Sequence, residues 1–225
     1  ATLSTTSAGT SNLTLGTNSG NSITSGGNFN VLLGNDAGTA LTTGDNNVAI
    51  GYEALKTEDA HGNNVAVGYQ ALKLQDAGDN AYNTAIGSGA GKTISTGAAN
   101  TIIGGLAGDA LTAGAANVAI GYQALTTEDG HGANTAVGYR ALRDLNAGAT
   151  GHNVAIGNDA GLLLNTGTIN TLVGSGSGDA MTVGLQNVGV GFGSLGANVA
   201  GHKNVALGTY ALYNMNAASS TNTFN

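Results

Sequence analysis

Hydrophobic and polar positions alternate in one short phrase that recurs along almost the whole chain. The phrase is Asn, then Val, Thr or Leu, then a variable residue, then an aliphatic residue, then Gly. It occurs twelve times and ends at Gly16, Gly34, Gly51, Gly68, Gly87, Gly104, Gly121, Gly138, Gly157, Gly174, Gly191 and Gly208. Because side chains alternate between the faces of a strand, we expect the two aliphatic positions of each phrase to point into a stacked core.

The interval between successive phrases is short and nearly constant, as from Gly34 to Gly51 and from Gly51 to Gly68. It is about 17 residues, whereas helical-pair repeats run from about 33 residues upward. One short strand plus its turns fits a coil of this length. The pattern therefore predicts an all-β parallel solenoid of about twelve coils. We expect a single domain over 1–225, with a lead-in at 1–11, coils over 12–212 and a tail at 213–225.

Three columns of the repeat have a physical interpretation. The Gly that ends each phrase is expected to turn the corner of the coil with a backbone angle that other residues resist. Three residues later there is always Ala or Ser, as at Ala37 and Ala54, which indicates a narrow interior. The Asn that opens each phrase predicts a hydrogen-bonded ladder along the solenoid rather than a row of ligand sites.

A longer period sorts the coils into two types. The fourth residue after the corner Gly is Gly in two successive coils and Leu in the next two. In each Gly-type coil an aliphatic residue follows three positions later, as at Leu41 after Gly38. Close packing of the interior predicts that the two arrangements fill the same volume. Four coils thus make one super-repeat, as from Gly34 to Gly104.

Bulky residues replace Ala in the middle of three phrases. They recur once per super-repeat. If this face of the strand points outward, they form apolar studs on an Ala-lined surface, and such patches mark interfaces. The candidate oligomer face is Leu32, Ile102 and Leu172.

Composition excludes several functional classes. The 225 residues contain no Cys and only 6 Lys plus Arg against 13 Asp plus Glu, for a net charge of −7. Thiol chemistry is therefore excluded, and nucleic-acid binding is not expected, because it needs clustered basic residues. No apolar run approaches the length of a membrane span, so we expect no membrane insertion.

Two loops carry the strongest candidate chemistry. Thr-Glu-Asp-Ala-His-Gly at 57–62 and Thr-Glu-Asp-Gly-His-Gly at 127–132 combine carboxylates with an imidazole. Such groups could bind a metal or transfer protons, but the loops lie four coils apart and cannot share one ion. We favour polar surface loops, with receptor contact as the alternative, and expect no metal, cofactor or catalytic group. The candidate receptor contacts are Glu58, Asp59, His61, Glu128, Asp129 and His131.

Aromatic residues follow the corner Gly in five Leu-type coils, at Tyr52, Tyr69, Tyr122, Tyr139 and Phe192. Neighbouring pairs should stack one coil apart and stabilise the solenoid as an aromatic ladder. Exposed rings could also bind the faces of sugars, so the four tyrosines are candidate aromatic contacts.

The phrases at 47–55 (NVAIGYEAL), 64–72 (NVAVGYQAL) and 134–142 (NTAVGYRAL) resemble repeats of bacteriophage tail-fibre and virion proteins. They are also similar to the head repeats of trimeric autotransporter adhesins. The resemblance covers about residues 12–212. It implies a left-handed β-roll, often trimeric, that is displayed on a virion or outside the cell and used in attachment. The coil of this chain is longer than that of the adhesin heads.

We therefore expect a non-enzymatic fibre or adhesin protein, extracellular or virion-borne, that mediates attachment to a cell surface. The expected partners are further copies of the chain, as a homotrimer or an end-to-end filament, and a cell-surface glycan or protein receptor. The principal alternative is a structural subunit that polymerises by end-to-end stacking. An ice-binding solenoid is a weaker alternative, since Thr42, Thr112 and Thr182 recur only once per super-repeat. A further alternative, a polysaccharide-cleaving enzyme of the tailspike type, rests on analogy alone.

Overall fold

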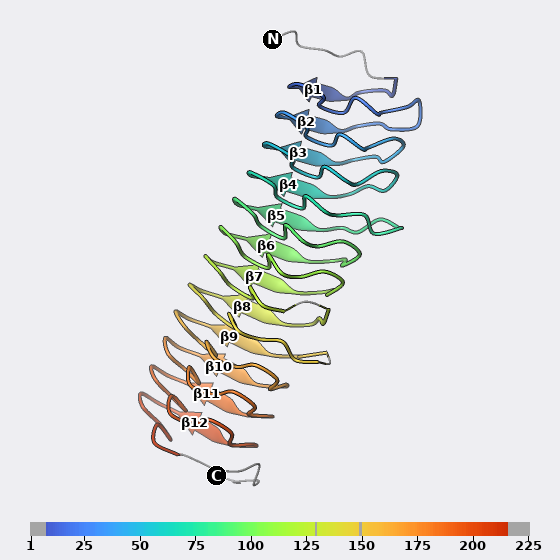
Figure 1. Cartoon of the computed structure of the whole chain (residues 1–225). Coiled ribbons are helices and arrows are strands. Elements are labelled where there is room, and N and C mark those ends of the chain that lie inside the picture. The colour runs from blue at the N-terminus through green and yellow to red at the C-terminus, as the bar shows by residue number, and fades with distance from the viewer. Residues whose placement is uncertain (1–7, 129, 149, 216–225) are drawn as a thin grey trace.

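Twelve three-residue strands stack in chain order into one parallel sheet (Figure 1). The computed structural model describes residues 8–128, 130–148 and 150–215. The described strands are β1 (Leu13–Leu15), β2 (Val31–Leu33), β3 (Val48–Ile50), β4 (Val65–Val67), β5 (Thr84–Ile86), β6 (Thr101–Ile103), β7 (Val118–Ile120), β8 (Thr135–Val137), β9 (Val154–Ile156), β10 (Thr171–Val173), β11 (Val188–Val190) and β12 (Val205–Leu207). The predicted all-β parallel solenoid is confirmed.

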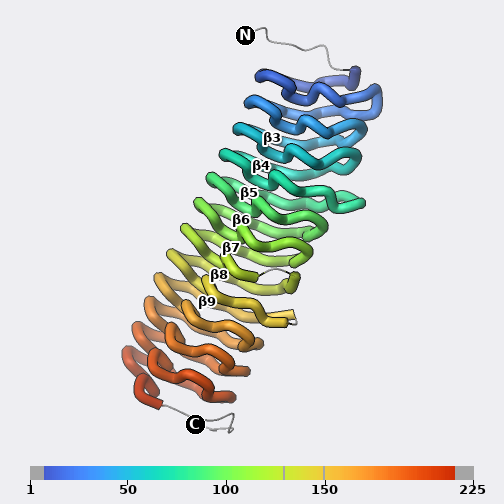
Figure 2. The backbone as a smooth tube through the Cα atoms, in the orientation of Figure 1, coloured from blue at the N-terminus to red at the C-terminus, as the bar shows by residue number. Residues whose placement is uncertain are grey.

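The rest of each coil is turns that also bond from one coil to the next. After the strand, the N–H of Gly38 donates to the carbonyl of Ala54 at 3.0 Å, and that of Leu55 to Ala71 at 3.0 Å. Figure 2 shows the result as a rod in which successive turns of the chain lie directly above one another. Most of the expected lead-in (1–11) and tail (213–225) lies outside the described residues.

The predicted orientation of the strands is wrong. In every strand the middle residue is buried and the two flanking residues are partly or largely exposed. Leu32, Ile102 and Leu172 are fully buried core residues, so they cannot form an oligomer face. Each coil already places a larger residue such as Leu41 or Leu55 in the interior, which leaves little room for a second at the strand centre, and Ala occupies most of these middle positions.

Two other core predictions are confirmed. Ala37 and Ala54, in the small-residue column, are fully buried, as are Leu41 of a Gly-type coil and Leu55 of a Leu-type coil. A Cβ added at Gly38 would lie 2.9 Å from Leu32 Cδ2. The Gly-type coils therefore make room for bulky strand residues, and the interior stays filled.

The corner Gly and the Asn column behave as predicted. Gly34 has a φ of +136°, and a Cβ there would lie 2.5 Å from the carbonyl oxygen of Gly51 in the next coil. In the Asn column, the N–H of Asn30 donates to Asn12 Oδ1, and the N–H of Asn47 to Asn30 Oδ1, both at 2.8 Å. Each corner thus packs backbone on backbone, and the amides form a continuous buried ladder.

Candidate functional site

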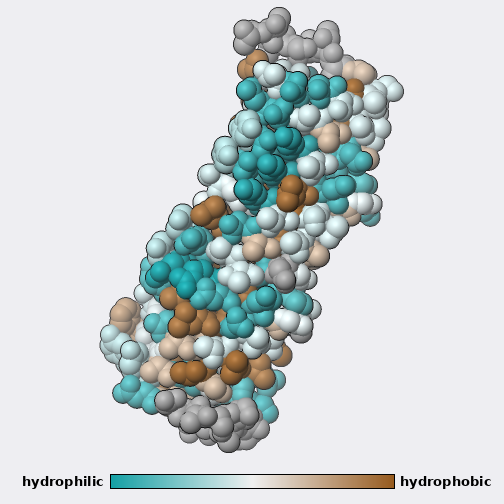
Figure 3. Space-filling view, viewed as in Figure 1, coloured by the Kyte–Doolittle hydropathy of each residue, from teal (hydrophilic) through white to brown (hydrophobic). Residues whose placement is uncertain are grey.

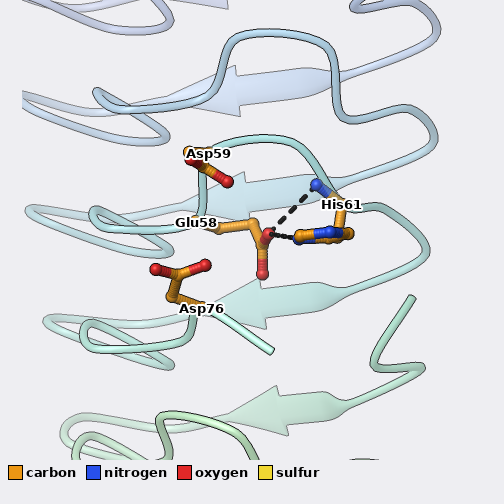
Figure 4. A group of neighbouring side chains, drawn as sticks. All are labelled: Glu58, Asp59, His61 and Asp76. Atoms are coloured by element: carbon orange, nitrogen blue, oxygen red, sulfur yellow. Dashed lines mark hydrogen bonds and ion pairs between the residues drawn. The ribbon is translucent and has the colours of Figure 1, made fainter. Parts of the chain in front are cut away.

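A cluster of acidic groups and one imidazole lies on the segment between β3 and β4 (Figure 4). The Glu58 side chain is fully buried, and its Oε1 lies 3.1 Å from both the backbone nitrogen and Nδ1 of His61. Asp59 is exposed, and Asp76 reaches the cluster from the next coil. One potential ligand atom from each of these four residues lies within 4.8 Å of the others.

Asp76 was missed by the sequence analysis, which considered each loop within a single coil. A signal was present, because Asp76 follows Asp59 by the length of one coil, just as Gly68 follows Gly51. Residues that occupy matching places in successive coils lie side by side in a solenoid, so aligning acidic residues by coil would have found it.

The second predicted loop has the same internal geometry. Glu128 is fully buried, and its Oε1 lies 3.1 Å from the backbone nitrogen and 3.0 Å from Nδ1 of His131. Its other oxygen, Oε2, accepts the N–H of Ala147 at 3.3 Å. The predicted contact Asp129 lies outside the described residues. Asn146 stands one super-repeat after Asp76, at the matching place of the second loop's neighbouring coil.

Burial raises the pKa of the Glu58 carboxyl above its ordinary value, because the charged form loses its hydration. The hydrogen bonds and charge of His61 oppose this shift, while the negative charge of Asp76 adds to it. Glu58 Oε2 is buried and has no hydrogen-bond partner among the described residues.

The predicted aromatic stacking is confirmed. The Tyr52 and Tyr69 ring centroids lie 5.5 Å apart, and those of Tyr122 and Tyr139 lie 5.9 Å apart, with nearly parallel planes in both pairs. The four side chains are between 45% and 54% exposed, so each pair presents ring surface to solvent. The Arg140 guanidinium lies 4.8 Å from the Tyr139 ring centroid, which favours a cation–π contact.

An ion network around Glu53, the residue after Tyr52, was also missed. Glu53 is only 7% exposed. It bonds Lys56 Nζ at 2.6 Å and, through Oε2, Lys73 Nζ at 2.7 Å and Gln70 Nε2 at 2.8 Å. These contacts, with Lys56 first, lower the pKa of Glu53 to about 2. Residues from two coils are thereby linked through one carboxylate.

The outer face of the sheet is apolar. The two flanking positions of the twelve strands carry aliphatic side chains except at Thr84, Thr101, Thr135 and Thr171. Exposure is 40% at Ile86 and Ile156 and reaches 68% at Leu207 in β12. In Figure 3, the brown patches of the face in view gather mainly toward the C-terminal half of the rod. Parallel sheets are usually covered on both faces, so the outer sheet face formed by these flanking positions is a candidate contact surface.

Comparison of the chain with protein-family models, with curated proteins and with solved structures finds no match. In the described part of the chain there is no helix with the length and apolar character that a membrane span requires.

Proposed function

We propose that this chain is a non-enzymatic fibre protein, of the phage tail-fibre or cell-surface adhesin type, that mediates attachment to a cell surface. The rod would hold recognition groups at fixed spacing outside the cell or on a virion. The observation that carries the proposal is the pair of exposed tyrosine stacks, at Tyr52/Tyr69 and Tyr122/Tyr139, repeated one super-repeat apart on one rigid solenoid.

The stacks suit recognition because their rings are already ordered before any ligand binds. Tyrosine offers a large apolar face and a polar hydroxyl, and rigid aromatic groups lose little conformational entropy on binding. Charged residues accompany both stacks: Glu53, which binds Lys56 and Lys73, directly follows Tyr52 in the chain, and the Arg140 guanidinium lies 4.8 Å from the Tyr139 ring centroid. Sugar rings of a surface glycan, with apolar faces and hydroxyl edges, match this combination.

The two stacks lie four coils apart, at about 19 Å for strands spaced by ~4.8 Å. A repetitive receptor could therefore engage both at once, and bivalent contact raises avidity without any new interaction. A change that removes one stack should weaken binding more than proportionally.

The test is binding of the intact chain to whole cells and glycan arrays. We expect Tyr52→Ala/Tyr69→Ala to reduce binding strongly, while Tyr82→Ala, at a 62% exposed tyrosine outside both pairs, leaves it unchanged. Replacing 58–61 and 128–131 by Gly-Ser tests the charged loops as receptor contacts. Attachment that survives both sets of changes would overturn the proposal.

We further propose that chains associate side by side, with a second copy covering the outer sheet face. The flanking positions of the twelve strands carry no charge, so two copies would meet without charge repulsion, and both carry side chains at the same strand spacing. Light scattering of wild type and Ile103→Lys/Ile120→Lys provides the test. A discrete oligomer that the double variant dissociates supports lateral association. Long filaments that it leaves intact would favour the alternative, end-to-end polymerisation.

A further inference from the structure

The loops 57–62 and 127–132 are nearly identical in sequence but differ in what faces them from the next coil. In both, a fully buried glutamate bonds the backbone and imidazole of the histidine three residues later. In the second loop, Glu128 Oε2 is also satisfied, by the N–H of Ala147. In the first loop, Glu58 Oε2 has no partner among the described residues although it is buried.

A buried carboxylate oxygen without a partner is costly, because water no longer solvates its charge. The cost is greater here because two further carboxylates, Asp59 and Asp76, lie within reach of Glu58. Lys56 and Lys73, the lysines of the same two coils, both bind Glu53 instead. The cluster thus holds three carboxylates and one imidazole around an unsatisfied oxygen, and a cation would satisfy it.

We propose that Glu58, Asp59, His61 and Asp76 bind one divalent transition-metal cation, of the Zn²⁺ or Mn²⁺ class. Figure 4 shows the four side chains converging from two successive coils. Zn²⁺ and Mn²⁺ accept imidazole nitrogen together with carboxylate oxygen, whereas Ca²⁺ takes oxygen ligands. His61 therefore selects the transition metals.

The bound cation would join the segment after β3 to the segment after β4. It would replace repulsion among the three carboxylates by attraction to a common centre. The described residues of the second loop offer no equivalent site, because Asn146 replaces the aspartate and Glu128 Oε2 is already hydrogen-bonded. Among the described residues, one such site is therefore expected. The inference does not depend on the attachment role proposed above.

The test is calorimetric titration of the tag-free chain with ZnCl₂ and, separately, with MnCl₂ and CaCl₂. We expect one equivalent of Zn²⁺ or Mn²⁺ per chain, and a higher thermal unfolding midpoint in its presence. Asp76→Asn should weaken binding at least about tenfold, since even outer-shell changes cost metal sites this much. Folding of this variant is expected to be intact, because Asn146 occupies the matching place in the same protein.

Two matched controls make the assignment specific. Asp79→Asn removes an equal charge from an exposed residue in the same loop as Asp76 and should leave binding unchanged. His61→Gln should weaken binding, whereas His131→Gln should not. The proposal is overturned by absence of binding at millimolar metal, by Ca²⁺ binding more tightly than Zn²⁺ and Mn²⁺, or by equal affinities in wild type and Asp76→Asn.

Discussion

The side-chain oxygen of Asn30 accepts the backbone N–H of Asn47 at 2.8 Å, one coil further along the rod. The same bond recurs from coil to coil along the buried Asn column, as at Asn100 and Asn117. Many of these Asn amides also donate to a carbonyl of the next coil, as Asn30 Nδ2 does to Gly44, whereas Asn64 donates to Gly62 of its own coil. Each Asn in such a step therefore satisfies backbone groups that would otherwise be buried without partners.

Replacing one Asn of this ladder should destabilise the rod. In Asn100→Ala, the N–H of Asn117 loses its acceptor Asn100 Oδ1, and the carbonyl of Gly114 loses its donor Asn100 Nδ2, both at 2.9 Å. An unsatisfied buried group costs about 1–3 kcal/mol, so we expect a loss of about 2–5 kcal/mol in the free energy of unfolding. Urea denaturation followed by circular dichroism measures it. Asn21→Ala, at an exposed Asn whose side-chain oxygen accepts from the Ser22 hydroxyl, should change stability by less than about 0.5 kcal/mol.

Adding a methyl group at a corner should be equally disruptive. Gly34→Ala combines a φ of +136° with a Cβ 2.5 Å from the Gly51 carbonyl oxygen. We expect a loss of at least about 2 kcal/mol, from backbone strain and from displacement of the next coil. Gly130→Ala is the matched control, because nothing lies within 4 Å of its added Cβ and the first loop has Ala60 there. A similar loss in both variants would contradict the backbone-packing account.

Because the strand centres are buried and their neighbours are not, substitutions at adjacent residues should destabilise the protein to very different extents. Leu172 is fully buried, so Leu172→Ala should cost about 2–5 kcal/mol of stability without changing oligomeric state. Val173 faces outward, so Val173→Ala should cost much less. Thermal unfolding with light scattering on the same samples separates the two. A change of oligomeric state in Leu172→Ala alone would restore the original assignment of Leu172 to an interface.

Stability should depend on pH through Glu53. Its pKa falls from 4.5 to about 2 on folding, so the unfolded chain binds the proton more readily. The stabilisation by Glu53 is therefore fully present above pH 4.5 and is lost as the pH falls toward 2. Glu53→Gln should remove this loss of stability between pH 4.5 and 2. Gln is compatible with the fold at this place, since Gln123 occupies it one super-repeat later. Urea midpoints measured from below the folded pKa to above the unfolded one provide the test, and identical profiles would contradict the ion network.

Some properties were determined by the sequence alone. The short and nearly constant period, the complete Asn column and the corner Gly specified a parallel solenoid, because each requirement recurs in every coil and needs no knowledge of distant contacts. The sequence also predicted that Leu41 of a Gly-type coil and Leu55 of a Leu-type coil fill the same part of the interior from different positions, because the interior has a constant volume.

The tertiary structure decided which face of each strand points inward. Alternation shows that two faces differ but not which is buried, and here the width of the interior decides, so Leu32 is core and Val31 is surface. It also decided which side-chain atoms bond between coils, where the repeat length indicates only which residues lie one coil apart. Asp76 joins Glu58, and Lys73 joins Glu53, because stacking places residues one coil apart in contact. A single loop sequence contains no record of its neighbour in the stack, and that neighbour is what turns two similar loops into two different sites.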